Sequence, residues 1–284
     1  MGVTDCHVHI NPVWEMLPRA RALLGHAGPG VEIERYTKDP DAFLEYLDRA
    51  GVERAVLVNY VAPEIVGYTE KANEFSAEYA RHAPDRLIAT GSVLPSHPDP
   101  EREVGRLIEK LGLRAMKVHP PHQLFAPNAY VDASAPGLKE FYAACERYQV
   151  PVIIHTGTSI FPGARNRFAQ PILVEDVAVD FPDLTIVLAH GGRPLWMNEA
   201  VFLARRFPHV YLEISSIPPA KLLDYFPELE RMSEKVLFGS DWPGPGVKDI
   251  GANLAAFRAL PMSALAKERI LETNPTKVFR RGSG

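Results

Sequence analysis

The chain contains few cysteines and shows no targeting segment at its start. Only two cysteines, Cys6 and Cys145, occur among its 284 residues. One possible pair in a chain of this length does not make the disulfide framework of a small secreted protein, so a reducing compartment is the simpler expectation. The first residues also lack the basic, apolar and small-residue succession of a signal peptide. These features predict a cytoplasmic protein.

The sequence has no strong excess of charge of either sign and no long apolar run. Its formal net charge is −4 and its pI is about 6.2, which gives no basic footprint for nucleic acid. No apolar stretch approaches the roughly 20 residues of a membrane span. We therefore expect a small-molecule partner, with no nucleic acid and no membrane. A homodimer is an open alternative, because the outer helices of barrels often pair.

Apolar runs alternate with helical patterns along the whole chain. The runs that we assign to strands cover residues 3–10, 54–59, 87–93, 114–118, 150–155, 184–190, 210–214 and 235–238. Most are continuously apolar, as expected when both faces of a strand are buried. Eight strands alternating with helices predict a single-domain α/β protein, a (β/α)8 TIM barrel over residues 1–281, with a short tail at 282–284. A doubly wound open sheet is the alternative, but no glycine-rich phosphate loop follows the first strand.

The segments between the strands are predicted to be helical, with one exception. Helical patterns cover residues 39–51, 69–82, 99–111, 137–148, 171–181, 195–206, 219–231, 249–259 and 263–272. In the first of these, Asp39 is placed as the N-cap, Pro40 in the first turn and Gly51 at the end. Residues 11–37 lack strong periodicity, and so long a loop in a compact domain is usually functional or a lid.

Four short stretches, each at the end of an apolar run, carry residue types that bind metals. They are Asp5-Cys6-His7-Val8-His9, Val152-Ile153-Ile154-His155, Val187-Leu188-Ala189-His190 and Leu237-Phe238-Gly239-Ser240-Asp241. Side chains at i and i+2 share one face of a strand, so His7 and His9 can turn toward one ion. In a barrel these ends lie at the carboxyl-terminal face, where β/α enzymes keep their sites.

We predict that His7, His9, His155 and Asp241 hold one divalent metal. Imidazole and carboxylate ligands suit zinc, the expected ion, and also manganese, iron or cobalt. Three histidines and one aspartate leave a position for water. The alternative for the two histidines of the first strand is that they are buried and hydrogen-bonded without a metal.

His190 ends the sixth strand and is followed by two glycines. An imidazole titrates near neutral pH, so it can take a proton from water and return it, which predicts a general acid/base. A fifth ligand or a structural histidine are the alternatives. Asp241 could share the proton, because a ligating carboxylate keeps a free oxygen. Glu213, at the end of the seventh strand, is a candidate hydrogen-bond partner for a ligand histidine or a structural acid.

Further residues near strand ends are candidates for binding substrate. Lys117, in the fourth strand, is predicted to pair with a carboxylate or to bind substrate. The alternative is a carbamylated lysine that bridges two metals. His119, in the loop beyond it, is predicted to face substrate or the surface. Arg165 and Arg167, after the fifth strand, are predicted to grip a substrate carboxylate or to be solvated loop charges. Trp196 is a candidate pocket wall, although aromatic residues often serve packing alone.

The motifs DCHVHI, MKVHPP, VIIHTG, VLAHGG and FGSDWP, in this order, resemble the amidohydrolase superfamily. The chain looks most like the branch that includes aminocarboxymuconate-semialdehyde decarboxylase and related hydrolases. The resemblance covers nearly the whole chain and implies a (β/α)8 barrel with one divalent metal, often zinc. It implies the ligands His7, His9, His155 and Asp241, and the acid/base His190. Because the family includes decarboxylases, lactone hydrolases and a hydratase, the fold does not choose the reaction.

The primary hypothesis is a metal-dependent hydrolase of a lactone, ester or amide bond in a small cyclic or carboxylated substrate, acting through activated water. The alternative is a non-oxidative decarboxylase of a small unsaturated or aromatic acid. A metal-binding barrel without catalysis is the third hypothesis. The complete set of five site residues argues against the third.

Overall fold

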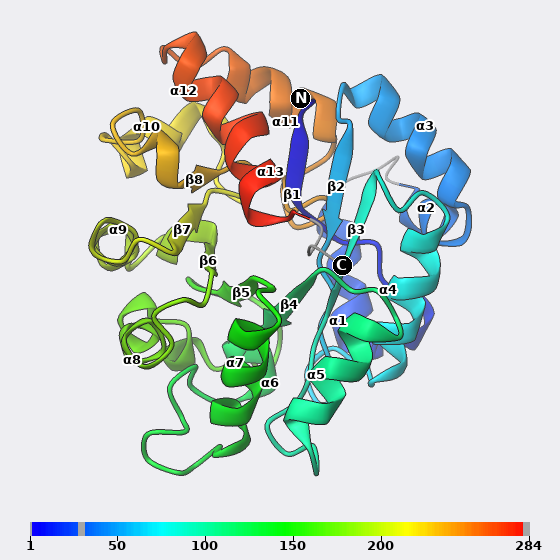
Figure 1. Cartoon of the computed structure of the whole chain (residues 1–284). Coiled ribbons are helices and arrows are strands. Elements are labelled where there is room, and N and C mark those ends of the chain that lie inside the picture. The colour runs from blue at the N-terminus through cyan, green and yellow to red at the C-terminus, as the bar shows by residue number, and fades with distance from the viewer. Residues whose placement is uncertain (1, 28–31, 281–284) are drawn as a thin grey trace.

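A parallel sheet of eight strands forms the centre of the molecule (Figure 1). The computed structural model describes residues 2–27 and 32–280, and the tail predicted at 282–284 lies outside them. The strands are β1 Thr4–Val8, β2 Arg54–Leu57, β3 Leu87–Gly91, β4 Ala115–Val118, β5 Val152–His155, β6 Ile186–Ala189, β7 Val210–Glu213 and β8 Val236–Leu237. Each strand pairs in parallel with the next along the chain.

The sheet closes nearly completely into a barrel. The amide of Cys6 donates to the carbonyl of Phe238 at 2.9 Å, and Val8 forms an isolated bridge with Trp242. These contacts join β8 and the residues after it to β1. The predicted (β/α)8 barrel is therefore confirmed.

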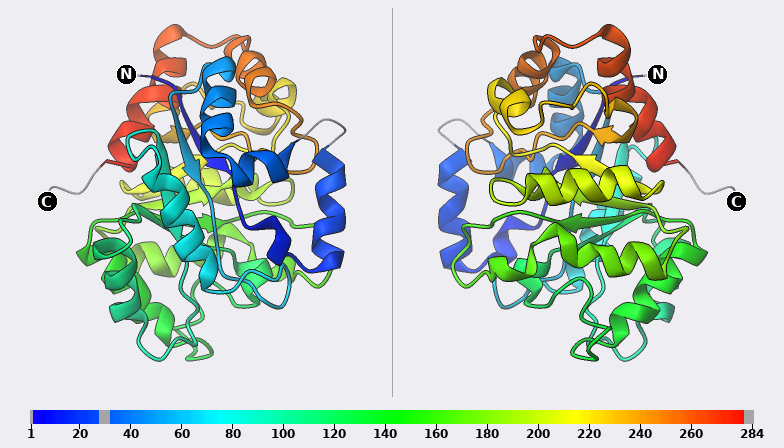
Figure 2. Two further views of the ribbon diagram at one scale, coloured as in Figure 1. Left: turned by 90° about the vertical axis from the view of Figure 1, so that its right-hand side faces the viewer. Right: turned by 90° about the vertical axis from the view of Figure 1, so that its left-hand side faces the viewer.

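Helices surround the sheet as an outer layer in both side views (Figure 2). In the described part of the chain they are α1 Pro18–Arg21, α2 Ile33–Lys38, α3 Pro40–Ala50, α4 Lys71–Arg81, α5 Pro100–Glu109, α6 Pro120–Gln123, α7 Gly137–Arg147, α8 Glu175–Asp180, α9 Met197–Arg206, α10 Leu222–Tyr225, α11 Ile250–Arg258, α12 Ala264–Glu268 and α13 Asn274–Val278. Within those residues no helix is both long and apolar enough to cross a membrane.

Aspartate caps start three of the outer helices. The carboxylates of Asp39, Asp99 and Asp249 each accept a hydrogen bond from the amide three residues later, which satisfies a free N–H of the first turn. Gly51 ends α3 with φ of 71°, a left-handed conformation that glycine adopts without a Cβ clash. The local signals in the sequence therefore predict α3 correctly.

Two predicted segments differ most from the structure. The helix predicted over 219–231 is wrong: a 3-10 turn at Pro219–Lys221 is followed by α10, which ends before Phe226. Phe226 precedes a proline and has φ −128° and ψ 75°, outside the helical region. Residues 11–37 are not a plain loop, because they contain α1, 3-10 segments at Val13–Glu15 and Ala22–Ala27, and most of α2. These elements are too short to produce a readable period.

A small apolar core fills the interior of the barrel, beneath the site. Its members are Cys6, Val56, Val58, Ile88, Ala115, Ile153, Val187, Ala189, Tyr211 and Leu237, with Val278 and Phe279 at the end of α13. Lys117, His155 and Glu213 each follow a member of this core by two residues on the same strand. Side chains two apart share a face, so these three form a polar layer nearer the carboxyl end.

Candidate metal centre at the carboxyl-terminal mouth of the barrel

The ends of β1, β5, β6 and β8 meet around a cavity of about 400 Å³. Its lining includes His7, His9, His155, His190 and Asp241. All of these except His9 are buried. The four stretches that the sequence singles out are thus brought together, although the first and the last lie more than 200 residues apart in the chain.

Asp241 lies against both histidines of the first stretch. Its Oδ1 atom is 3.0 Å from Nε2 of His9 and 3.6 Å from Nε2 of His7. The amide of Asp241 donates to the carbonyl of His7 at 2.8 Å, which ties the end of β8 to β1. Asp241 has φ of 67°, which few residues with a side chain adopt, and this turn aims its carboxylate into the cavity. Burial alone would raise the pKa of Asp241, but the hydrogen bond from His9 and the charge of His7 lower it, so the carboxylate stays ionised.

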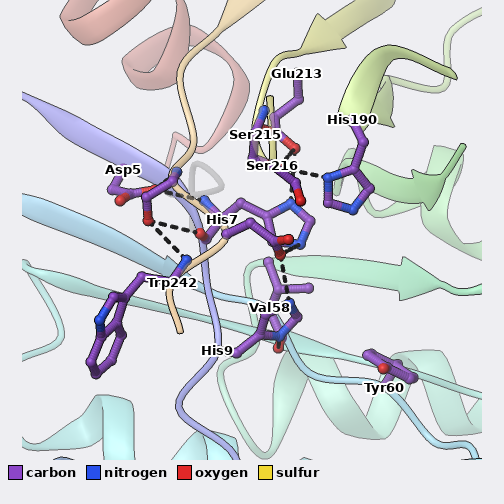
Figure 3. Close-up of polar contacts among 12 residues, drawn as sticks. Asp5, His7, His9, Val58, Tyr60, His190, Glu213, Ser215, Ser216 and Trp242 are labelled. Atoms are coloured by element: carbon purple, nitrogen blue, oxygen red, sulfur yellow. Dashed lines mark hydrogen bonds and ion pairs between the residues drawn. The ribbon is translucent and has the colours of Figure 1, made fainter. Parts of the chain in front are cut away.

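In His7 and His9, the ring nitrogen that does not face Asp241 is held by an acceptor from the protein (Figure 3). Nδ1 of His7 lies 2.8 Å from Oε2 of Glu213, and Nδ1 of His9 lies 3.0 Å from the carbonyl of Val58. Carboxylate and carbonyl oxygens only accept hydrogen bonds, so both Nδ1 atoms carry a hydrogen. Each Nε2 therefore faces Asp241 with a lone pair or an added proton. Hydrogen bonds of this kind orient histidine ligands in metal sites.

His155 presents an unused nitrogen. Its Nε2 lies 3.2 Å from the carbonyl of Gly157, so Nε2 carries the hydrogen. Its Nδ1 is buried and has no hydrogen-bond partner among the described residues. Burial, together with the charges of Lys117 and Arg193, lowers the pKa of His155 well below its usual range, so the ring is neutral. A neutral ring with an unpartnered lone pair in this cluster fits a divalent metal.

His190 directly follows β6 and packs against the rings of His7 and His155. Its ring centroid is 4.7 Å from that of His7 and 4.6 Å from that of His155. Burial first, and then the charge of Arg193, lower the pKa of His190 well below its usual range. Ligand-type atoms of His7, His190 and Asp241 lie within 4.8 Å of one another, which makes this trio a candidate divalent-metal site. This trio includes His190 where the prediction has His9 and His155, and the division of roles stays a prediction.

Three imidazole rings stack into a column beside the cluster. His119 lies between His155, at 3.9 Å between centroids, and His122, at 3.7 Å. Both His119 and His122 line the cavity, and the contact of His119 with substrate stays a prediction. His122 bonds Tyr60 Oη at 2.9 Å through Nδ1. The column therefore forms one wall of the cavity.

Lys117 is buried beneath the cavity rather than in its wall. Its Nζ has no hydrogen-bond partner among the described residues. Burial lowers its pKa to about 8, although Glu213 and Asp241 act in the opposite direction. Lys117 is therefore a buried amine close to two carboxylates without a direct ion pair to either.

The arginine in the cavity is Arg193, which the sequence analysis does not single out. Its guanidinium donates to the carbonyl of Thr158 at 3.1 Å and to Oγ of Ser216 at 2.7 Å. Its Nε is buried and has no partner among the described residues. A signal exists in the sequence, since Arg193 follows His190 by three residues at a strand end where cavity loops begin.

The other residues proposed for substrate lie outside this cavity. Arg165 and Arg167 are exposed, and the guanidinium of Arg167 lies over the ring of Phe168. Trp196 lines a separate surface depression with Leu195. The loops that carry these three residues contribute Phe161 and Pro194 to the cavity lining, but none of the three is part of that lining.

The barrel and its His/Asp cluster define a class of protein, the β/α-barrel with a candidate metal site at its carboxyl-terminal mouth. The profile of the amidohydrolase family matches residues 4–281. The chain therefore belongs to the amidohydrolase family, as the resemblance of its motifs predicts. This membership also confirms the prediction of an enzyme.

Individual proteins are similar over nearly the whole chain. The γ-resorcylate decarboxylase of Rhodococcus jostii (strain RHA1) is 24% identical over 296 residues, 84% of this chain and 87% of that protein. An uncharacterised TIM-barrel protein from Bordetella bronchiseptica superposes with a TM-score of 0.76, at 24% identity and covering 100% of both chains. A probable 2-pyrone-4,6-dicarboxylic acid hydrolase from Acinetobacter baumannii has a TM-score of 0.71, at 18% identity and covering 98% and 99%. The two structures support the barrel fold.

Proposed function

We propose that the chain is a metal-dependent hydrolase that cleaves a lactone, ester or amide bond in a small cyclic or carboxylated substrate. One observation carries this proposal. His190 lies at the edge of the His/Asp cluster, and its Nδ1 is 2.8 Å from Oγ of Ser215. With Nδ1 engaged there, the other nitrogen of the neutral ring is available to accept a proton in the cavity.

In this proposal His7, His9, His155 and Asp241 hold the metal. Two of these histidines have Nδ1 bound to protein acceptors, and His155 has a buried unpartnered Nδ1, so three imidazole nitrogens and one carboxylate are free to bind. Zinc is the ion we propose, because it favours nitrogen ligands with one carboxylate, and manganese, iron or cobalt fit the same donors. When bound, the metal lowers the pKa of water and polarises a carbonyl.

The side chains of this chain supply the remaining chemistry. His190 takes a proton from the attacking water and returns it to the leaving group. Asp241 keeps one oxygen free to share that proton. Arg193, half-buried at the cavity wall and without an ion-pair partner among the described residues, binds a substrate carboxylate. His119 forms part of the cavity wall beside the substrate, and Lys117 lies beneath the cavity.

A non-oxidative decarboxylase is the second candidate function. The specific observation in its favour is the curated relative, a γ-resorcylate decarboxylase similar over most of both chains. In this reaction Arg193 would orient the substrate, and His190 would deliver a proton to the carbon that loses carbon dioxide. A neutral His190 can act as the base of a hydrolase directly, whereas decarboxylation first requires that His190 gain a proton.

A two-armed assay distinguishes the reactions. Metal-loaded protein is given 2-pyrone-4,6-dicarboxylate and simple lactones in one arm, and 2,6-dihydroxybenzoate and related aromatic acids in the other. Ring opening without carbon dioxide release supports the hydrolase. Release of carbon dioxide from an aromatic acid, with no lactone opened, would replace it by the decarboxylase. Turnover in neither arm would favour a barrel that binds metal without this chemistry.

A further inference from the structure

Glu213 is a carboxylate with both oxygens in use, buried at the end of β7. Its Oε2 accepts from Nδ1 of His7 at 2.8 Å and from Oγ of Ser215 at 2.9 Å. Its Oε1 accepts from the amide of Ser215 at 2.5 Å. Glu213 is fully buried. Charge-assisted hydrogen bonds of this kind are strong where water is excluded.

Ser215 extends this network to His190 (Figure 3). A hydroxyl has one hydrogen, and Ser215 gives it to the carboxylate of Glu213, which can only accept. Its oxygen is then the acceptor for Nδ1–H of His190 at 2.8 Å. The order of donation is therefore His190 to Ser215, Ser215 to Glu213, and His7 to Glu213.

We propose that Ser215 and Glu213 are positioning residues that set the tautomer and orientation of His190 and tie them to the metal ligand His7. The inference rests on the proposed function, in which His190 is the base. With its hydrogen held on Nδ1 by Ser215, His190 directs the lone pair of Nε2 toward the substrate. Because Glu213 also orients His7, this one carboxylate aligns both a proposed metal ligand, His7, and the proposed base, His190.

Gly239 shows how closely the fold fits around this carboxylate. A Cβ at position 239 would collide with Oε1 of Glu213 and with the Cβ of His7. The φ of Gly239 is not in the left-handed region, so the position needs glycine for space rather than for backbone conformation. The glycine of the FGSDWP motif therefore makes room for Glu213 beside His7.

The test uses the metal-loaded full chain with Ser215→Ala. This change removes the hydroxyl that receives Nδ1–H of His190 but leaves the bond between His7 and Glu213. We expect 15N NMR of histidine-labelled protein to show that His190, assigned with His190→Asn, loses its Nδ1–H tautomer. Metal affinity should stay within about threefold, while kcat falls by roughly ten- to a hundredfold with little change in KM.

Thr90→Val is the matched control. Thr90 also has a buried hydroxyl, which bonds backbone groups of residues 57 and 59 and has no hydrogen bond to a histidine among the described residues. It should leave the His190 signals unchanged. Ser215→Thr, which keeps the hydroxyl, should restore the wild-type tautomer.

Three results would overturn the inference: unchanged His190 signals in Ser215→Ala, loss of metal from that variant, or the same tautomer change in Thr90→Val. The NMR readout needs no substrate. Failure of the proposed reaction therefore appears separately, as wild-type protein with the expected tautomer but no turnover of lactones.

Discussion

Oδ1 of Asp241 lies 3.0 Å from Nε2 of His9, although the two residues are 232 positions apart in the chain. The carbonyl of Val58 holds the hydrogen of His9 on Nδ1. The facing carboxylate oxygen and ring nitrogen would repel each other as two lone pairs, so a proton or a cation belongs between them. This relationship makes the metal proposal directly testable.

Elemental analysis of purified protein should find about one divalent metal per chain. His9→Ala and Asp241→Ala should each lower metal affinity by more than about a hundredfold, because each removes a proposed ligand and leaves its partner unpaired. His209→Ala, an exposed histidine outside the cavity, is the control. A content of two metals per chain would instead bring Lys117 back as a carbamylated bridge.

His190→Asn should retain metal but lower kcat by about a hundredfold or more, since it removes a general base without removing a proposed ligand. Metal content and steady-state kinetics are measured on the same preparation. Loss of metal would show that His190 is a ligand, as its closeness to His7 and Asp241 allows. Retained activity would place the base elsewhere.

Arg193→Met should raise KM for a carboxylated substrate by about ten- to a hundredfold, because it removes a charge-assisted hydrogen bond at the half-buried cavity wall. A lactone without a carboxylate should be affected much less. Arg165→Met gives the comparison, since Arg165 is exposed and outside the cavity lining. The reverse pattern would support the role predicted for Arg165 from the sequence.

Metal-free protein should become less stable as the pH falls below about 6.5. Burial first, and then the charge of Lys117, lower the pKa of His122 to about 3. Between these two values the unfolded chain binds a proton that the folded chain does not, so the free energy of unfolding falls with falling pH. This residue alone accounts for about 2 kcal/mol at a pH of about 5.

Urea unfolding near pH 5 and near pH 7.5 measures this effect. His122→Gln should reduce the difference between the two free energies, while His209→Gln, an exposed change, should preserve it. An equal difference in all three proteins would show that His122 does not contribute.

Much of the barrel could be predicted because its signals are local. Continuous apolar runs mark strands buried on both faces, and Asp39 and Gly51 mark the ends of a helix within a few residues. The short elements within 11–37 and the break at Phe226 could not be predicted with the same success. The helix α1 has a single turn and therefore no readable hydrophobic period. At Phe226 the apolar pattern favours a helix, but the proline that follows disfavours it.

The sequence by itself determined which residues gather at the mouth of the barrel. His7, His9, His155, His190 and Asp241 end strands, and parallel strands in a barrel bring their carboxyl ends to one face. Only the tertiary structure decided the contacts among side chains in the loops. Arg193 enters the cavity while Arg165 turns to solvent, and Glu213 joins His7 to His190 through Ser215. These outcomes depend on loop paths and rotamers set by packing across the whole barrel, which no local pattern encodes.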